Sequence, residues 1–152
     1  MRPSVARPVE PSTSRLRLRP YVPGDFLSIR HLWTAAGLHL GPSDSWRELE
    51  RARRRDPDLF LVAEERGLLV GAVLGRFDGR RGWVNHLAVD RGVRSRGIGS
   101  ALMREVERRL RSKGCLKVNL HVASANRRVR DFYTGIGYTQ APLLFMEKWL
   151  RT

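Results

Sequence analysis

The segment that most limits the possible folds is a strand, a long helix and a second strand in direct succession. Apolar patterning predicts strands over 83–89 and 116–122, with a helix over 97–111 between them. One stripe of this helix is apolar and consists of Ile98, Leu102, Val106 and Leu110. A helical connection of this length joins two strands that run parallel as neighbours in one sheet. The chain is therefore expected to belong to the α/β class.

The remaining pattern places this parallel pair in a mixed, mostly antiparallel central sheet. Further strands are expected over 15–20, 59–63, 69–77 and 143–149, and further helices over 26–36, 45–56 and 125–134. Asp25 is expected to cap the first helix and Gly37 to end it. The turns between the strands at 59–63, 69–77 and 83–89 are short, which indicates an antiparallel meander.

Length and composition predict one domain that needs no disulfide or structural metal. The chain has 152 residues and a single cysteine, Cys115, and we expect no metal site. Residues 1–14 are rich in proline and small polar residues, so a disordered leader is expected before a single domain over 15–152. With no long apolar run, the protein is interpreted as soluble, cytoplasmic and without a membrane partner.

The net charge of +14 raises a second class of function, a basic module that binds nucleic acid. Three features argue against it. Nearly all the basic residues are arginines, a bias that codon composition alone can produce, and the basic run over 104–111 is interrupted by Glu105 and Glu107. No aromatic residues are interleaved to stack on bases. A nucleic acid partner is therefore not favoured, although binding that falls steeply with salt would support it.

The loop between the strand at 83–89 and the following helix has the composition of a phosphate site. Glycines at 97 and 99 allow close approach to the unpaired amides at a helix start, and Arg94 and Arg96 add positive charge. A P-loop requires a Lys after the glycine, which is absent here. A dinucleotide fingerprint requires a small residue where Leu102 stands. A pyrophosphate bound by backbone amides is the favoured interpretation.

The run Arg94-Ser95-Arg96-Gly97-Ile98-Gly99 resembles the Arg-x-x-Gly-x-Gly loop of the GNAT superfamily of acetyl-CoA-dependent N-acetyltransferases. A second stretch over 126–138 resembles that family's later signature, with Asn126, then Phe132-Tyr133, then Gly137-Tyr138. The resemblance covers about 15–148. It implies the GNAT fold, in which helices cover both faces of the sheet and the parallel pair of strands splays apart.

The resemblance also implies an activity, a cosubstrate and site residues. The activity would be transfer of an acetyl group from acetyl-CoA to an amine, either of a small molecule or of a protein N-terminus or lysine. The backbone of Leu87, Ala88 and Val89 would bind the pantetheine arm. The pyrophosphate would be held by Arg94, Ser95, Arg96, Gly97, Ile98, Gly99 and Ser100. Asn126 would contact the cosubstrate, and Tyr133 would lie near the sulfur as the general acid.

The general base is left open by the sequence. The strand over 83–89 has no carboxylate, so His86, His121, Glu64, Glu65 or a water are all candidates. A weak base would favour α-amines over lysine side chains. The acceptor cleft is expected between 37–45 and 139–144. A non-catalytic acetyl-CoA-binding regulator and a homodimer paired through the final strand also stay open.

Overall fold

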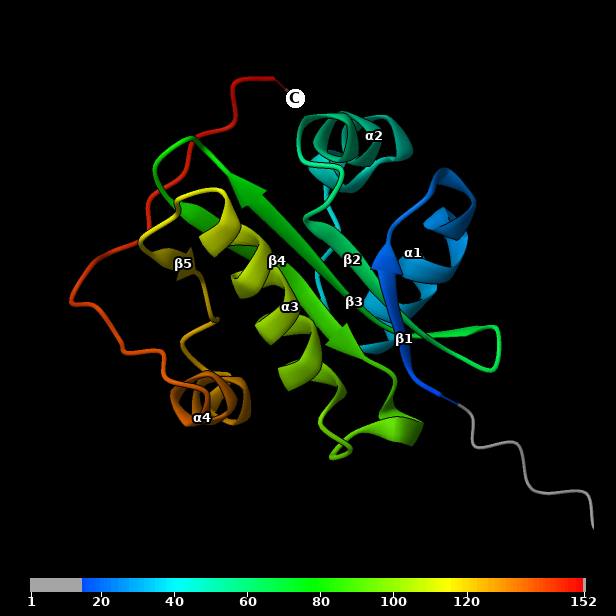
Figure 1. Cartoon of the computed structure of the whole chain (residues 1–152). Helices are drawn as coiled ribbons and strands as arrows, with labels where there is room; N and C mark the ends of the chain where they lie inside the picture. Colours follow the sequence, from blue (N-terminus) through cyan, green and yellow to red (C-terminus); the bar gives the residue numbers. More distant parts are fainter. Residues whose placement is uncertain (1–14, 152) are drawn as a thin grey trace, which may run out of the picture. The chain divides into compact units, whose positions relative to one another are not determined.

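The computed structural model describes residues 15–151, which form two compact units (Figure 1). The first unit extends to Leu120 and the second begins at His121. The expected leader over 1–14 lies outside the described residues. No helix among residues 15–151 combines the length and the apolar character that crossing a membrane requires.

A five-stranded mixed sheet organises the first unit. Its strands, in spatial order, are β1 (Arg17–Pro20), β2 (Phe60–Glu65), β3 (Leu68–Phe77), β4 (Gly82–Val89) and β5 (Val118–Leu120). All neighbouring pairs are antiparallel except β4 and β5, which are parallel and joined through α3 (Ile98–Ser112). The predicted mixed sheet with one parallel pair is confirmed. The fifth strand is shorter than expected.

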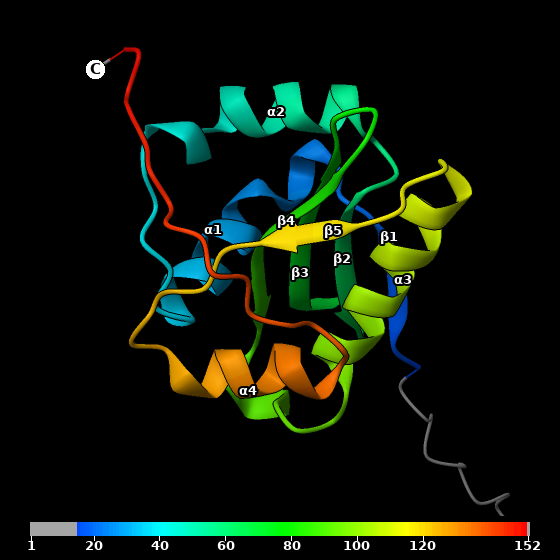
Figure 2. The ribbon, with the colours of Figure 1, turned by 90° about the vertical axis from the view of Figure 1, so that its left-hand side faces the viewer.

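Helices α1 (Phe26–Ala35) and α2 (Trp46–Arg55) precede the meander, and α1 covers the face of the sheet opposite α3 (Figures 1 and 2). Short 3-10 turns lie at Pro23–Asp25, Pro42–Asp44 and Arg91–Val93. The main core lies between this helical layer and the sheet, and consists of Tyr21, Ile29, Leu32, Trp33, Leu49, Phe60, Val62, Ala72, Leu74 and Ala88. Each large apolar side chain buried there stabilises the fold by about 1.5–3 kcal/mol.

The two helix starts on this face differ in their caps. The Ser45 hydroxyl accepts a hydrogen bond from Glu48 N and so caps α2. Asp25 precedes α1 but makes no cap bond, so that expectation is wrong. Its carboxylate instead accepts from Val22 N and from the Arg19 guanidinium. An arginine on β1 outcompetes the helix amides because a charged, bidentate donor binds a carboxylate more strongly.

On the other face, α3 lies unusually close to the sheet because glycines stand opposite its apolar stripe. A Cβ added at Gly71 would lie 3.0 Å from Leu102, and one added at Gly82 would lie 2.7 Å from Leu110. At Gly75 an added Cβ would lie 2.8 Å from the carbonyl oxygen of Leu59. The backbone of β3 and β4 therefore lies closer to α3 at these glycines than a residue with a side chain would permit.

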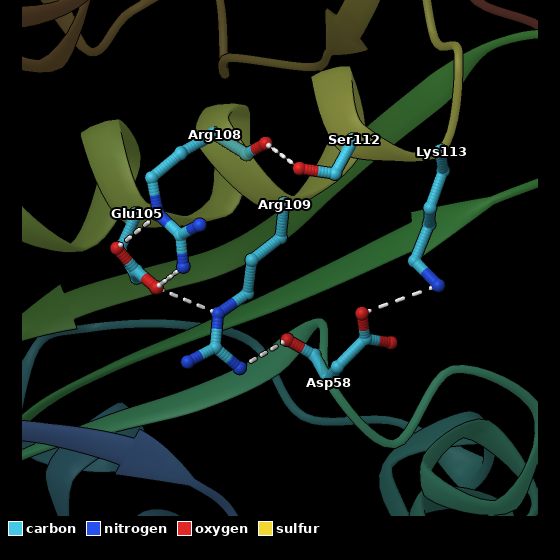
Figure 3. A network of polar contacts seen from close by, with 6 residues as sticks. All are labelled: Asp58, Glu105, Arg108, Arg109, Ser112 and Lys113. Atoms are coloured by element: carbon cyan, nitrogen blue, oxygen red, sulfur yellow. Dashed lines mark hydrogen bonds and ion pairs between the residues drawn. The ribbon is translucent and has the colours of Figure 1, made fainter.

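Polar contacts hold the C-terminal half of α3 to the turn before β2 (Figure 3). Arg109 Nη1 donates to the carbonyl oxygen of Asp58 at 2.8 Å, and Lys113 Nζ lies 3.2 Å from the Asp58 carboxylate. Glu105 accepts hydrogen bonds from both Arg108 and Arg109. These contacts fix the direction of α3 and, with it, the position of its N-terminus.

The second unit contains α4 (Arg127–Gly135), whose N-terminus is capped by the Asn126 side chain. The prediction of a strand over 143–149 is wrong, since none of these residues is in a strand. A strand requires a hydrogen-bonded partner, and Leu143 N bonds instead to the carbonyl oxygen of Ala141, two residues back. The apolar side chains of Leu143, Leu144 and Met146 are exposed.

Candidate functional site

The N-terminus of α3 presents a group of unpaired backbone amides. Gly97 is the cap residue, has a positive φ of 78° and offers no side chain to the helix. The first helical bond runs from Ala101 N to the Gly97 carbonyl, so the amides at 98–100 have no partner within the helix. Ser95 also has a positive φ, of 65°. Such an uncapped start of a long helix favours an anion through both amides and dipole.

The two arginines of the loop turn toward the protein rather than away from it. Arg96 donates two hydrogen bonds to the Glu65 carboxylate at the end of β2, at 2.6 and 3.1 Å. Arg94 Nε donates to the carbonyl oxygen of Val89 at 3.1 Å. Glu65 raises the pKa of Arg96, so this guanidinium is firmly charged. The two side chains thus tie the loop to β2 and β4 and add positive charge beside the amides.

Strand β4 has an open edge beyond its first three residues. Within the described residues, β5 pairs only with Gly82, Trp83 and Val84 of β4. Among residues 15–151, the remainder of β4 has no ladder partner on that side. This part includes the predicted site residues Leu87, Ala88 and Val89. Backbone groups left without a strand partner at such an edge can pair with amide groups of a ligand.

A bulge in β4 begins where the edge opens. Ala72 pairs with Ala88 and Leu74 pairs with Asn85, so two residues of β4 stand opposite one residue of β3. His86 lies in this bulge with a positive φ of 51°. A non-glycine residue in this region costs on the order of 1–3 kcal/mol and persists only where the surroundings enforce it. A bulge locally disrupts a strand, and this one follows directly after the last β4 residue that pairs with β5.

The side chain of His86 is held from two sides. Its Nε2 atom lies 2.7 Å from Oδ1 of Asp44, a residue 42 positions earlier, in the 3-10 turn before α2. The Trp33 ring packs edge-on against the imidazole, with centroids 4.7 Å apart. Asp44 is the residue that the sequence analysis missed. Its neighbourhood predicts only a helix start, and no local pattern links a carboxylate to a histidine so far along the chain.

The two glutamates considered as bases are engaged elsewhere. Glu64 accepts from Arg19 Nε at 2.9 Å, and Glu65 accepts from Arg96. Both lie on β2, which is separated from β4 by β3. The arrangement of the sheet therefore favours His86 over these two residues.

In the second unit, Asn126 and Tyr133 lie at opposite ends of α4. The Asn126 side-chain oxygen accepts from Val129 N at 3.2 Å. Tyr133 is buried, its ring packs against those of Phe132 and Tyr138, and burial raises its pKa to about 12. The hydroxyl is therefore protonated throughout the neutral range. His121 packs against Phe145, with ring centroids 4.4 Å apart.

A mixed sheet whose one parallel pair is joined through a long helix defines the fold class of this chain, and the family comparison agrees with it. The model described as the Acetyltransferase (GNAT) family matches residues 26–138, so the chain belongs to this family. It is 36% identical over 135 residues to an acetyltransferase of Pectobacterium atrosepticum, which covers 89% of this chain and 96% of that protein.

Solved structures show the same fold. Ard1 from Thermoplasma volcanium superposes with a TM-score of 0.69 and 26% identity, and 82% of each chain is covered. The PaiA N-acetyltransferase from Thermoplasma acidophilum, solved in complex with coenzyme A, gives a TM-score of 0.72 at 21% identity over 82% of this chain and 90% of that chain. At this lower identity the likeness concerns the fold alone.

Proposed function

We propose that the protein transfers the acetyl group of acetyl-CoA to a primary amine. The observation that carries the proposal is the direct succession of an open β4 edge and an uncapped α3 start, joined by the short turn at Arg91–Val93. These two features match the two chemical parts of coenzyme A, an amide-containing arm and a diphosphate. The coenzyme A complex of the PaiA enzyme, which shares the fold, supports the same ligand class.

In this proposal the backbone does most of the binding. The amides of Ile98, Gly99 and Ser100 hold the diphosphate, in a loop whose shape depends on Gly97 and Ser95. The edge of β4 over 87–89 pairs with the amides of the pantetheine arm. Arg94 and Arg96 act mainly by keeping the loop in place, because both guanidinium groups already have protein partners.

The chemical step is direct attack of the amine on the thioester. The nitrogen lone pair forms a bond to the acetyl carbon, the carbon–sulfur bond breaks, and the sulfur leaves as a thiolate that takes a proton. Tyr133 is the proposed donor of that proton, and Asn126 is a proposed contact of the cosubstrate. The products are an N-acetyl amine and coenzyme A.

The acceptor must lose a proton before it attacks. For a lysine side chain at pH 7 this costs roughly 4–5 kcal/mol, whereas an α-amine costs only about 1 kcal/mol. The protein carries a net charge of +14, which disfavours polycationic acceptors at low ionic strength. The low cost of deprotonation favours an α-amine, and the positive charge of the protein favours an acceptor molecule that is neutral or acidic.

The test is calorimetric titration with coenzyme A, followed by a screen of amines with acetyl-CoA in which release of the thiol is measured. Gly97→Ala and Gly114→Ala form a matched pair. Both glycines have φ near 80° and open space around them, but only Gly97 is at the N-terminus of α3. Both variants should lose similar stability, and only Gly97→Ala should weaken coenzyme A binding, by tenfold or more. Equal affinity in both variants would contradict the proposed diphosphate site.

A further inference from the structure

We infer that His86 is the general base of the proposed acetyl transfer and that Asp44 is a positioning residue that decides which imidazole nitrogen carries the proton. The inference deepens the proposed function and rests on it. It starts from the pair itself: His86 Nε2 and Asp44 Oδ1 are 2.7 Å apart and come from β4 and from the turn before α2.

The Asp44 carboxylate has both oxygens occupied in a defined way. Oδ2 accepts from the backbone amide of Gly41 at 2.9 Å, and Oδ1 faces His86 Nε2. The residue is buried, with 7% of its surface exposed. An ionised carboxylate only accepts hydrogen bonds, so Nε2 must carry a hydrogen. In the neutral imidazole the lone pair is then on Nδ1, the nitrogen that can take a proton.

The surroundings keep the ring in this orientation. The Trp33 ring packs edge-on against it, and the positive φ of His86 aligns the residue in the bulge. Two charged side chains contact the pair or its neighbour. Arg30 on α1 donates to the Asp44 carbonyl oxygen at 3.4 Å, and Arg76 on β3 donates to the neighbouring Asn85 side chain.

The location fits the reaction. His86 immediately precedes the β4 edge over 87–89 that is proposed to hold the pantetheine arm. In the step, Nδ1 removes one proton from the acceptor ammonium, and the neutral amine forms the carbon–nitrogen bond. The second nitrogen proton is lost as the carbon–sulfur bond breaks, and the thiolate is protonated. His86 then releases its proton to solvent, so one proton is produced for each acetyl group transferred.

The first test measures the tautomer in the folded protein, through the nitrogen chemical shifts of the ¹⁵N-labelled His86 imidazole. Wild type should show hydrogen on Nε2. In Asp44→Asn the single carbonyl oxygen must face Gly41 N, which leaves the amide NH₂ facing Nε2. The hydrogen should therefore move to Nδ1, and kcat should fall at least 30-fold. A wild-type hydrogen on Nδ1, or a switched tautomer with unchanged kcat, would overturn the inference.

The second test is His86→Asn, since asparagine tolerates positive φ and can still donate to Asp44. With alanine tetrapeptide amide as the acceptor probe, kcat should fall about 10²-fold or more at neutral pH. Coenzyme A affinity should stay within threefold, and the loss of kcat/KM at acid pH that the inference predicts for wild type should disappear. His31→Asn, which removes an exposed imidazole on α1, should behave as wild type.

The outcomes distinguish the proposed acetyl transfer from the assignment of His86 as its base. Wild type that binds no coenzyme A, or that acetylates neither the probe nor any amine of the screen, contradicts the proposed function and the base together. Wild type that turns over while His86→Asn stays within threefold contradicts only the base. A large loss of kcat with retained coenzyme A affinity and a lost acid limb supports both.

Discussion

The Arg96 guanidinium and the Glu65 carboxylate form a two-point contact, with Nη2 to Oε1 at 2.6 Å and Nη1 to Oε2 at 3.1 Å. This contact joins the loop before α3 to the end of β2. The sequence predicts that Arg96 adds positive charge beside a bound pyrophosphate. In the structure Arg96 also has a partner within the protein.

Replacing Arg96 separates these two roles. Because Glu65 is nearly buried, Arg96→Ala should lower the urea midpoint of unfolding while weakening coenzyme A binding less than tenfold. Arg96→Lys should restore little, since an ammonium cannot make the bidentate contact. Unchanged stability together with a hundredfold weaker affinity would show that Arg96 binds the diphosphate directly.

Tyr133→Phe tests the proposed proton donor. With a pKa near 12, the hydroxyl stays protonated in assays up to about pH 10. Full transfer of its proton to a thiolate of ordinary pKa, ~8.5, is uphill by about 5 kcal/mol. We therefore expect a loss near the low end of general acid catalysis, about 10²-fold in kcat, with coenzyme A affinity retained. Steady-state kinetics and calorimetry measure the two quantities, and an unaltered kcat would remove Tyr133 from the mechanism.

The lowered pKa of Glu105 should make the stability of the fold depend on pH. Hydrogen bonds from Arg108 and then from Arg109 lower its pKa from 4.5 to about 2. The fold favours the ionised form, so this contribution is present above about pH 4.5 and is lost as the pH falls toward 2. Because the group is near the surface, the contribution should be below about 1 kcal/mol. The free energies of unfolding of wild type and Glu105→Gln, measured with urea, should converge as the pH falls toward 2. A difference that stays constant with pH would show that the ionisation of Glu105 does not contribute to stability.

Gly75→Ala tests the close approach of the sheet to α3. The added Cβ would lie 2.8 Å from the Leu59 carbonyl oxygen and 3.1 Å from Val106, so backbone must move. We expect a loss of about 1–3 kcal/mol in the free energy of unfolding. Gly24→Ala is the control, because no atom lies within 4 Å of its added Cβ. Equal stabilities of the two variants would show that α3 adjusts without cost.

Features carried by neighbouring residues were predictable from the sequence. Ser45 caps α2, Gly97 begins α3 and the apolar stripe of α3 faces the sheet, as capping and helical periodicity require. The order of the elements made β4 and β5 parallel neighbours. The prediction of a strand over 143–149 was wrong, because an apolar composition does not determine whether the fold offers the hydrogen-bonded partner that a strand needs.

By itself, the sequence determined the α/β class, the loop at the start of α3 and the family. These depend on periods of two and 3.6 residues, on caps and on glycine, all of which act over a few positions. Only the tertiary structure decided the partners of the ionisable side chains: Arg96 on Glu65, Arg19 on Asp25, and His86 on Asp44. A long or ionisable side chain binds whichever hydrogen-bond or charge partner the fold brings near, and that neighbour can be 42 residues away.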